Sequence, residues 1–260
     1  MRQWKNFAEE IARRAGALLK EKFSQKHEIH YKGEINLVTE ADKFSEDLII
    51  TAINRNFPDH GILAEESPAI AGAGKMRWII DPLDGTTNYA HGYPVFCVSI
   101  ALEKDGIIIL GVIYDPMREE MFIAVRGEEA YLNGKKLSVS LTRDISRSLL
   151  ATGFPYDIRN SKENNLDYFN SMAKEAQAIR RAGAAALDIA YVAAGRFDGF
   201  WELKLMPWDM AAGLLMVEEA GGAVSELFGG NWNISSPNIL VSNGLIHKQM
   251  IKIFKNAVKK

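Results

Sequence analysis

The N-terminal part of the chain carries apolar residues at a helical spacing. They recur every three or four positions from Trp4 to Leu19, with charged residues between them. Apolar side chains at this spacing lie on one face of a helix. The pattern predicts an amphipathic helix over Met1–Phe23. A second helix is predicted over Ala41–Asn56, closed by Pro58.

The next part of the chain consists of short apolar runs separated by turn residues, a pattern typical of strands. Two of the separators, Lys104-Asp105-Gly106 and Asn133-Gly134, are hairpin signals, because Asp-Gly and Asn-Gly favour tight turns between antiparallel strands. The runs therefore predict a sheet that contains antiparallel hairpins. The predicted strands are Ile62–Ala64, Met76–Ile80, Phe96–Glu103, Ile107–Tyr114, Met121–Val125, Ala130–Leu132 and Lys136–Ser140.

Strands and helices mix in the second half of the chain. The predicted strands there are Ser148–Thr152, Gly199–Glu202, Ala223–Ser225 and Ile239–Ser242, and the predicted helices are Leu166–Ala178, Ala184–Ala194, Asp209–Ala220 and Leu245–Val258. The whole pattern predicts a layered α+β protein. We expect a single unit over residues 1–260, with an N-terminal α+β half (1–145) and a C-terminal α/β half (146–260).

Composition and charge favour an ordinary globular protein without a polyanionic partner. Apolar residues make up 47% of the 260 residues, charged residues make up 25%, and the formal net charge is -2. This balance gives no reason to expect nucleic acid or an anionic membrane as a partner. The N-terminal helix lacks the uninterrupted apolar core of a secretory signal, and no window approaches the length of a membrane span.

Cys97 is the only cysteine, so the chain can form no internal disulfide. A reducing compartment is therefore the default, and we expect a cytoplasmic protein. Because Cys97 lies in the apolar run Val95–Ile100, it is expected to be a small buried residue rather than a nucleophile.

The run from Asp81 to Asn88, which reads DPLDGTTN, is the strongest sign of chemistry. It follows an apolar strand, so Asp81 and Asp84 are expected where that strand ends. Gly85 permits a positive φ or the close approach of an anion. Two hydroxyl residues follow at the start of a helical turn, where N–H groups attract phosphate. Together these features predict metal-assisted phosphate chemistry, and a simple Asp-Gly turn is the alternative.

Four acidic residues share a position at a strand end or a helix start: Glu65, Asp81, Asp84 and Asp209. Sheet proteins place ligand sites at such edges, and four carboxylates together would suit Mg²⁺. Taken singly, Glu65 could be a loop acid and Asp209 only a helix N-cap. Asp42, which is outside this set, could likewise be no more than a first-turn charge on its helix. Their occurrence together with the run described above favours one common site.

These segments resemble the motifs of the inositol monophosphatase family. Trp78–Asn88 is similar to its first motif, and Trp208–Gly213 with Glu218–Gly222 is similar to its second. Ala64–Ser67 matches its upstream acidic motif, and Asn36–Asp42 matches its N-terminal motif. The resemblance covers nearly the whole chain. It implies a layered α-β-α-β-α sugar-phosphatase fold, with mixed sheets and antiparallel hairpins between helix layers, usually in a homodimer.

The resemblance further implies Mg²⁺-dependent hydrolysis of a phosphomonoester, with inhibition by Li⁺ in many members. Carried over to this chain, Glu65, Asp81 and the carbonyl of Leu83 would hold one Mg²⁺. Asp81, Asp84 and Asp209 would hold a second, and some members bind a weaker third ion near Glu65. The N-terminal half of a single catalytic unit would thus supply most metal ligands, and the C-terminal half would supply Asp209 and the substrate contacts.

The same resemblance assigns the groups that act on water and phosphate. Thr86, hydrogen-bonded to Asp42, would help Glu65 to orient the attacking water. The N–H groups of Gly85 and Thr86 would hold the phosphate. Attack by metal-activated water needs no protein nucleophile and forms no covalent intermediate. The phosphate-binding segment would comprise Leu83, Asp84, Gly85 and Thr86.

For the rest of the substrate, Glu202 and the backbone near Ala185 would face the hydroxyls of a sugar or polyol phosphate. Asp209 would contact a hydroxyl as well as metal. Arg180 would lie near the site, and an ion pair in the structure or at a dimer interface is its alternative. Animal members carry a histidine in the stretch that here reads Leu205-Met206-Pro207, whereas the segment after Arg180 is more similar to prokaryotic members.

The leading interpretation is a phosphatase of myo-inositol 1-phosphate. A fructose-1,6-bisphosphatase, or an enzyme with both activities, is the nearest alternative, because some prokaryotic members hydrolyse both substrates. Phosphatases of bisphosphate nucleotides and of histidinol phosphate use related motifs and rank lower. A regulator that binds another protein and retains the phosphatase fold is the alternative from a different class, because some bacterial relatives bind the transcription machinery.

Overall fold

Helices and strands alternate along the part of the chain that the computed structural model describes, residues 1–23, 29–31 and 37–257. The helices are α1 (Arg2–Phe23), α2 (Glu40–Asn56), α3 (Thr86–Ala90), α4 (Leu166–Met172), α5 (Ala185–Ala193), α6 (Pro207–Glu219) and α7 (His247–Ala257). The strands of the first half are β1 (Ile29–Tyr31), β2 (Leu37–Thr39), β3 (Gly61–Ala64), β4 (Met76–Asp84), β5 (Cys97–Lys104), β6 (Ile107–Asp115), β7 (Glu120–Val125), β8 (Ala130–Leu132) and β9 (Lys135–Lys136). The strands of the second half are β10 (Leu149–Thr152), β11 (Ala178–Arg180), β12 (Gly199–Glu202), β13 (Ala223–Glu226) and β14 (Ile239–Ser242).

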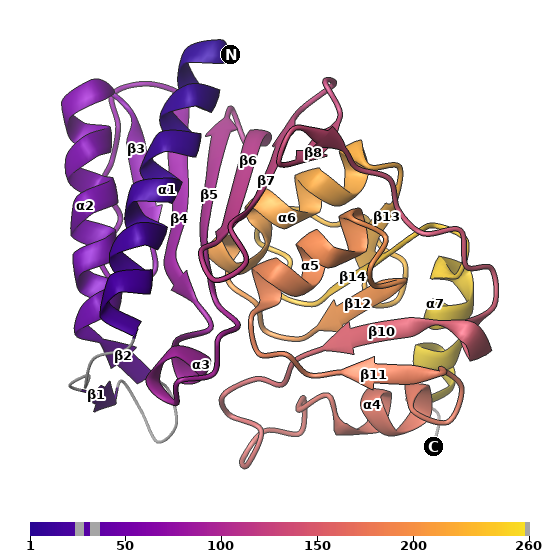
Figure 1. The fold of residues 1–260 in the computed structure, drawn as a ribbon. Coiled ribbons are helices and arrows are strands. Elements are labelled where there is room, and N and C mark those ends of the chain that lie inside the picture. The colour runs from indigo at the N-terminus through magenta and orange to yellow at the C-terminus, as the bar shows by residue number, and fades with distance from the viewer. Residues whose placement is uncertain (24–28, 32–36, 258–260) are drawn as a thin grey trace.

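Two large sheets separate three layers of helices (Figure 1). The first sheet has seven strands in the order β3-β4-β5-β6-β7-β8-β9, and the second has five in the order β11-β10-β12-β14-β13. From the left to the lower right of Figure 1, the layers are α1 with α2, the seven-stranded sheet, α5 with α6, the five-stranded sheet, and α4 with α7. The expected layered α-β-α-β-α fold is therefore confirmed.

The seven-stranded sheet is antiparallel except where β3 runs parallel to β4. Both predicted hairpins are present. Asp105 (φ 52°) and Gly106 (φ 81°) connect β5 to β6, and Asn133 (φ 47°) and Gly134 (φ 77°) connect β8 to β9. Two successive residues with positive φ form the turn whose twist matches that of paired strands, which explains the Asp-Gly and Asn-Gly sequences.

The five-stranded sheet is mixed, since β10 pairs in parallel with β11 and β12 while β14 pairs antiparallel with β12 and β13. A separate two-stranded sheet joins β1 to β2. The N-terminal motif was expected to begin at Asn36, and that residue lies outside the described residues. The rest of the motif forms β2 and the first turn of α2.

Two predicted elements have the wrong extent. The helix expected over Leu166–Ala178 ends at Met172, and residues 178–180 form the edge strand β11 instead. Leu149 lies opposite Ala178 and Leu150 opposite Ile179 in the parallel ladder with β10. This pairing satisfies backbone groups and is set by a partner strand far away in the chain, so the local apolar pattern could not reveal it. The strand predicted over Lys136–Ser140 is likewise reduced to β9.

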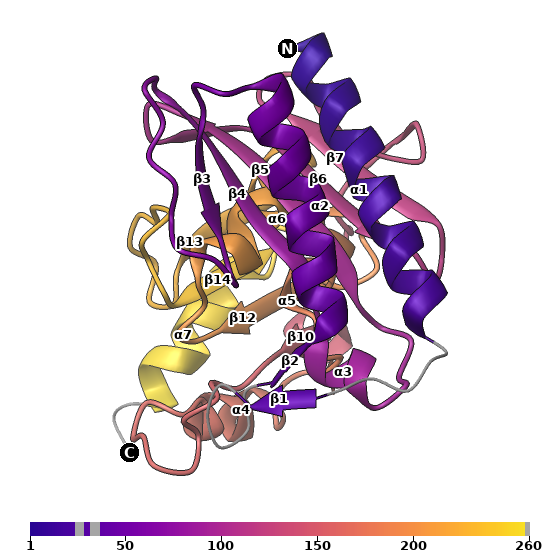
Figure 2. The same cartoon turned by 90° about the vertical axis from the view of Figure 1, so that its left-hand side faces the viewer.

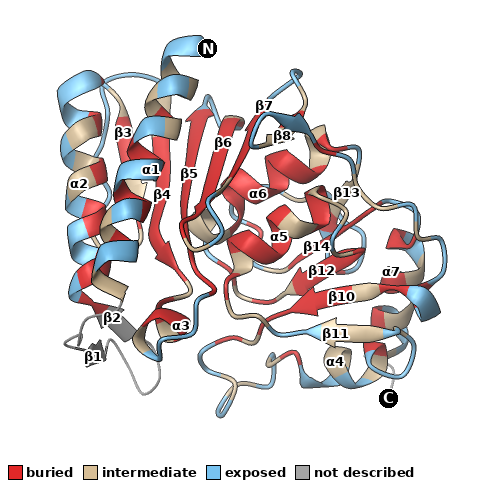
Figure 3. Ribbon diagram, viewed as in Figure 1, coloured by how far each residue is buried: buried red, intermediate tan, exposed pale blue. Residues whose placement is uncertain are grey.

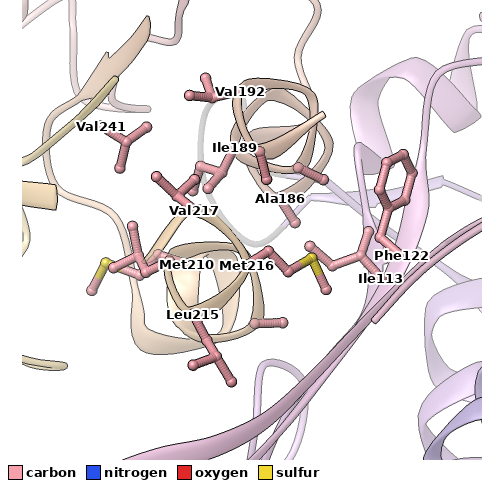
Figure 4. Close-up of a cluster of buried hydrophobic side chains, with 14 of the residues drawn as sticks. Ile113, Phe122, Ala186, Ile189, Val192, Met210, Leu215, Met216, Val217 and Val241 are labelled. Carbon is pink, nitrogen blue, oxygen red and sulfur yellow. The ribbon is translucent and has the colours of Figure 1, made fainter. Parts of the chain in front are cut away.

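The two central helices are buried between the sheets. Figure 3 shows α5 and α6 mostly in the colour of buried residues, and every residue from Met210 to Val217 is buried. Their side chains meet residues of both sheets, such as Ile113 and Val241, in one apolar cluster (Figure 4). Small residues allow this close approach: a Cβ on Gly213 would lie only 2.7 Å from the Ile189 side chain.

The predicted N-terminal helices α1 and α2 cover the other face of the seven-stranded sheet (Figure 2). Helix α1 buries one stripe that includes Ile11, Ala15 and Leu19, as its helical spacing predicts. Among the described helices, none is both long enough and apolar enough to cross a membrane.

Candidate active site

Strand β4 carries the two aspartates of the sequence motif inside the sheet rather than beyond its end. The strand extends to Asp84, and the ladder with β5 shifts between the pairs Asp81–Ser99 and Asp84–Cys97. This irregularity accommodates the intervening proline, which has no N–H to donate to a ladder. The Leu83 N–H donates to Asp81 Oδ1 over 3.0 Å, so the motif's own backbone orients its first carboxylate.

Gly85 connects strand β4 to helix α3. Its φ of 98° is left-handed, and a Cβ at this position would lie 2.8 Å from the carbonyl oxygen of Val95. Both conditions require glycine. The chain then turns at once into α3, which brings the N–H groups of Gly85 and Thr86 to the start of a helical turn beside the aspartates.

Thr86 and Asp42 form a buried hydrogen-bonded pair. Thr86 Oγ1 lies 3.0 Å from Asp42 Oδ1 and 3.1 Å from the carbonyl oxygen of Leu83. Thr39 donates twice to the other Asp42 oxygen, from its N–H over 2.8 Å and from its hydroxyl over 2.6 Å. Burial raises the pKa of Asp42, and these hydrogen bonds oppose the rise. Asp42 is therefore fixed before any ligand arrives.

Asp84 joins the two halves of the chain. The N–H groups of Ala185 and Ala186, at the start of α5, donate to its two carboxylate oxygens over 3.2 and 2.8 Å. A helix N-terminus favours such a negative group. The Ala185 N–H, expected near substrate hydroxyls, thus holds Asp84 here. Asn88 strengthens the junction by donating from Nδ2 to the carbonyl of Ala182 over 2.8 Å.

Asp209 enters the site from the first turn of α6. This helix begins at Pro207, two residues earlier than predicted, so Asp209 is not an N-cap residue. Its Oδ2 accepts a hydrogen bond of 2.7 Å from the Met206 N–H. Proline suits the first helical position because that N–H would have no partner within the helix.

These residues line one cavity of ≈ 470 Å³. Among the described residues that line it, seven carry carboxyl groups and only two are basic. The acids are Glu65, Asp81, Asp84, Asp157, Asp188, Glu202 and Asp209, and the bases are Arg181 and Lys204. One of the two bases is already engaged, because Lys204 Nζ lies 2.6 Å from Asp157 Oδ2. The cavity is therefore strongly acidic.

Most of the expected site residues meet at this cavity. Those that line it are Glu65, Asp81, Leu83, Asp84, Gly85, Thr86, Ala185, Glu202 and Asp209. Asp42 reaches it only through Thr86. Arg180 lies outside on the edge strand β11, where it is exposed, and its neighbour Arg181 lines the cavity instead. Successive side chains of an extended chain point to opposite sides, so a shift of one position separates the two arginines.

The buried carboxyl groups raise one another's pKa values. Burial raises the pKa of Asp81 well above its ordinary range, and the charges of Glu65, Asp84 and Asp209 raise it further. Burial likewise raises the pKa of Asp84 to about 7, opposed by the Ala186 N–H. It raises the pKa of Asp209 to about 7, opposed by the Met206 N–H. Groups that repel in this way are stabilised by a cation.

Comparison with known proteins agrees with this geometry. The family model described as the inositol monophosphatase family matches residues 1–259. The chain belongs to this family. It is 44% identical over 252 residues to the inositol-1-monophosphatase of Synechocystis sp.. The aligned region covers 96% of this chain and 88% of that protein. It is 43% identical over 249 residues to Nus factor SuhB of Escherichia coli, covering 95% and 93% of the two chains.

A solved structure gives the same result for the fold. The inositol monophosphatase from Anabaena (Nostoc) sp. matches with a TM-score of 0.90 and 42% identity, over 98% of this chain and 96% of that one. As a member of the inositol monophosphatase family, the chain is a phosphatase that hydrolyses phosphomonoesters.

The donor set of the cavity fits the metal dependence general to inositol monophosphatases. Carboxylate and carbonyl oxygens are the ligands that Mg²⁺ prefers. Among the described residues, no three such side chains already surround one point closely enough to hold an ion. Glu65, Asp81, Asp84 and Asp209 line the cavity and are the carboxyl groups that could hold a metal ion there.

The cavity residues that were missed in the sequence include Gly153, Arg181 and Asp188. Asp188 lies on α5, where it is only 2% exposed, and its Oδ1 has no hydrogen-bond partner among the described residues. Burial and the nearby Glu202 raise its pKa well above the ordinary range. Asp188 could have been noticed, because it is the one acidic residue within the small-residue helix predicted over Ala184–Ala194. Nothing in the sequence around Gly153 pointed to the site.

Proposed function

We propose that this phosphatase is Mg²⁺-dependent and hydrolyses myo-inositol 1-phosphate to myo-inositol and phosphate. The charge of the cavity carries the proposal, with seven carboxyl groups against two basic ones. A phosphate dianion would be repelled by such a cavity unless cations lay between them. The volume of ≈ 470 Å³ lies within the range of small-molecule sites, about 300–1,000 Å³.

In this proposal, Glu65, Asp81 and the Leu83 carbonyl hold one Mg²⁺, and Asp81, Asp84 and Asp209 hold a second. A third, weaker ion would bind near Glu65. When bound, the ions would offset the phosphate charge, activate a water molecule and stabilise the leaving alkoxide. Phosphoryl transfer mainly requires positioning and charge stabilisation, so no side chain of the protein has to act as a nucleophile.

The chain itself orients the reactants. The hydroxyl hydrogen of Thr86 is directed to Asp42 or to the Leu83 carbonyl, so its oxygen can accept a hydrogen bond from water and, with Glu65, orient that water. The N–H groups of Gly85 and Thr86, at the start of α3, would receive the phosphate. Neither task requires the chain to form a bond with phosphorus, so no covalent intermediate is expected.

In this proposal Glu202, which lines the same cavity, recognises the polyol. Glu202 would accept hydrogen bonds from substrate hydroxyls, with the Ala185 backbone and Asp209 beside it. Burial raises the pKa of Glu202 to about 8, and Arg181 opposes this rise. Arg181 lines the cavity, and we propose it, rather than Arg180, as the basic group that acts there.

We also propose the assembly and location that the family resemblance implies. Residues 1–260 would act as a single catalytic unit, because the central apolar cluster draws side chains from residues 1–145 and 146–260 alike. The active form would be a cytoplasmic homodimer. Light scattering of the purified protein tests the oligomeric state directly.

Two alternatives come from specific observations. Sequence similarity to prokaryotic members supports fructose 1,6-bisphosphate as an alternative or additional substrate. Similarity to relatives named Nus factor SuhB supports a role as a protein-binding regulator that retains the phosphatase site. An Asp84→Asn variant in a pull-down from extract would separate partner binding from turnover.

The test is a comparison of kcat/KM for inositol 1-phosphate and fructose 1,6-bisphosphate at saturating Mg²⁺, with and without Li⁺. A higher value for inositol 1-phosphate, reduced by Li⁺, is the expected result. A higher value for the bisphosphate would replace the proposed substrate, and no release from either would favour the regulatory role.

A further inference from the structure

Gly153 faces the proposed polyol-binding acid across the end of two strands. It follows β10 directly and lines the cavity together with Glu202. A Cβ built on Gly153 would overlap the carboxylate carbon and both carboxylate oxygens of Glu202. The Glu202 carboxylate therefore occupies the space that any other side chain at position 153 would need.

The strand register explains this close approach. Strands β10 and β12 run parallel, with Ala151 opposite Phe200 and Thr152 opposite Trp201. One residue further along, Gly153 follows the end of β10 and Glu202 is the last residue of β12. These two residues therefore lie beside each other at the same level of the sheet edge. The constraint is one of space rather than of backbone conformation, because φ of Gly153 lies outside the left-handed region.

Asn165 fixes both strand ends at this level. Its Nδ2 donates to the Gly153 carbonyl over 2.6 Å and to Thr152 Oγ1 over 2.9 Å, and its Oδ1 accepts from Trp201 Nε1 over 2.7 Å. Thr152 Oγ1 in turn donates to the Trp201 carbonyl over 2.7 Å. Asn165 is only 2% exposed and adopts a φ of 71°, a conformation that asparagine tolerates better than most residues. The backbone beside Glu202 is therefore held by a satisfied, buried network.

We propose that Gly153 is a specificity-determining position of this pocket: its missing side chain lets the Glu202 carboxylate lie against the strand end, and Asn165 holds the backbone that makes the space. In this arrangement Gly153 and Asn165 are positioning residues, and they act only through Glu202. The inference rests on the proposed function, since it concerns the hydroxyl-bearing part of a polyol phosphate. A side chain at position 153 would displace Glu202 and remove the preference for hydroxyl-bearing substrates.

The experiment measures kcat/KM at saturating Mg²⁺ for inositol 1-phosphate and for p-nitrophenyl phosphate, which has no hydroxyl for Glu202 to bind. In Gly153→Ala, we expect kcat/KM for inositol 1-phosphate to fall about 10- to 100-fold, the range for leaving a buried hydrogen-bonding group without its partner. The value for p-nitrophenyl phosphate should fall much less. Gly74→Ala is the matched control, because a Cβ there would meet only the Asp59 carbonyl at 3.6 Å, an ordinary contact.

A double variant distinguishes a positioning role of Gly153 from general damage to the fold. Glu202→Asp shortens the acid by one methylene group, so the double variant Gly153→Ala/Glu202→Asp should regain part of the preference that Gly153→Ala loses. Equal losses on both substrates, or no rescue, would overturn the inference. Full retention of the preference by Gly153→Ala would also overturn it and leave the proposed function standing. If the wild type itself shows no preference for the polyol phosphate, the proposed function fails instead.

Discussion

Asp84 shows how a single residue connects the sequence motif to the tertiary structure. It lies at the end of β4, yet both its oxygens accept hydrogen bonds from N–H groups at the start of α5, about a hundred residues later in the chain. Cys97 Sγ lies 3.7 Å from the same carboxylate and is fully buried, as expected for a residue with no nucleophilic role. The direction of this proposed metal ligand is thus fixed by the fold.

Thr86 is expected to affect turnover more than binding. Thr86→Ala removes the hydroxyl that lies 3.0 Å from Asp42 Oδ1 and should lower kcat on the order of 100-fold, as for other groups that assist proton transfer. KM for inositol 1-phosphate should change by less than about threefold. Thr86→Ser keeps the hydroxyl and serves as the control. A raised KM at unchanged kcat would make Thr86 a binding residue instead.

His247 should make folding stability depend on pH. Its ring nitrogens lie 2.9 Å from the hydroxyls of Ser225 and Ser242, and burial lowers its pKa. As pH falls through about 6.5, the unfolded chain binds a proton that the native protein resists, so stability is lost on acidification and is unaffected well above that pH. The loss from this group is at most about 1.4 kcal/mol per pH unit.

Urea unfolding of the wild type and His247→Asn at pH 7.5 and 5.5 measures this effect. The variant has no titrating ring, so its stability should fall less between the two pH values. An equal or larger fall in the variant would show that His247 is not responsible.

The residues with the clearest chemistry could be found in the sequence, and those that position them could not. Asp81, Asp84 and Gly85 stand in one short run whose residue types serve metal and phosphate. Gly153 and Asn165 are separated from Glu202 by dozens of residues and carry no chemistry of their own. Their role depends on the register of β10 with β12, which only the folded sheet defines.

At the scale of elements, helix α6 depends on its close approach to the seven-stranded sheet. Gly111 of β6 makes this possible, because a Cβ there would lie 2.7 Å from the carbonyl oxygen of Ala212 and 2.9 Å from its Cα. Both are backbone atoms of a buried helix, so they cannot move away cheaply. The first turn of the same helix carries Asp209.

Gly111→Ala should therefore lower both stability and activity. Overpacking of this kind costs about 1–3 kcal/mol, or about 2–10 °C in Tm for a chain of this size. Thermal unfolding and phosphate release measure the two effects, and Gly74→Ala is again the control. A Gly111→Ala protein with unchanged Tm would contradict the packing argument.

Elements with a strong local signal were predicted well, and elements defined by distant partners were not. The amphipathic helix α1 and the two hairpins follow from periodicity and turn chemistry alone. Strand β11 is three residues long and exists through its pairing with β10, so its sequence resembled the end of a helix. The start of α6 shifted because Pro207, not Asp209, occupies the first helical position.

At the scale of the whole molecule, one buried layer links the halves. Helices α5 and α6 of the second half pack between the two sheets and contribute to an apolar cluster with Ile113 and Phe122 of the first half (Figure 4). The cavity lies along the same junction, since five of its seven acids come from β4, α5, β12 and α6. Assembly of the core therefore also assembles the acidic site.

As proposed above, this acidic cavity needs divalent cations in order to hydrolyse a phosphomonoester. The most direct measurement is phosphate release from inositol 1-phosphate as Mg²⁺ is titrated into metal-free wild type and Asp81→Asn, followed by excess chelator. We expect release that rises with Mg²⁺, is abolished by chelator, and is lower by orders of magnitude in a folded Asp81→Asn protein. Release by the wild type without divalent cations, or normal release by Asp81→Asn, would contradict it.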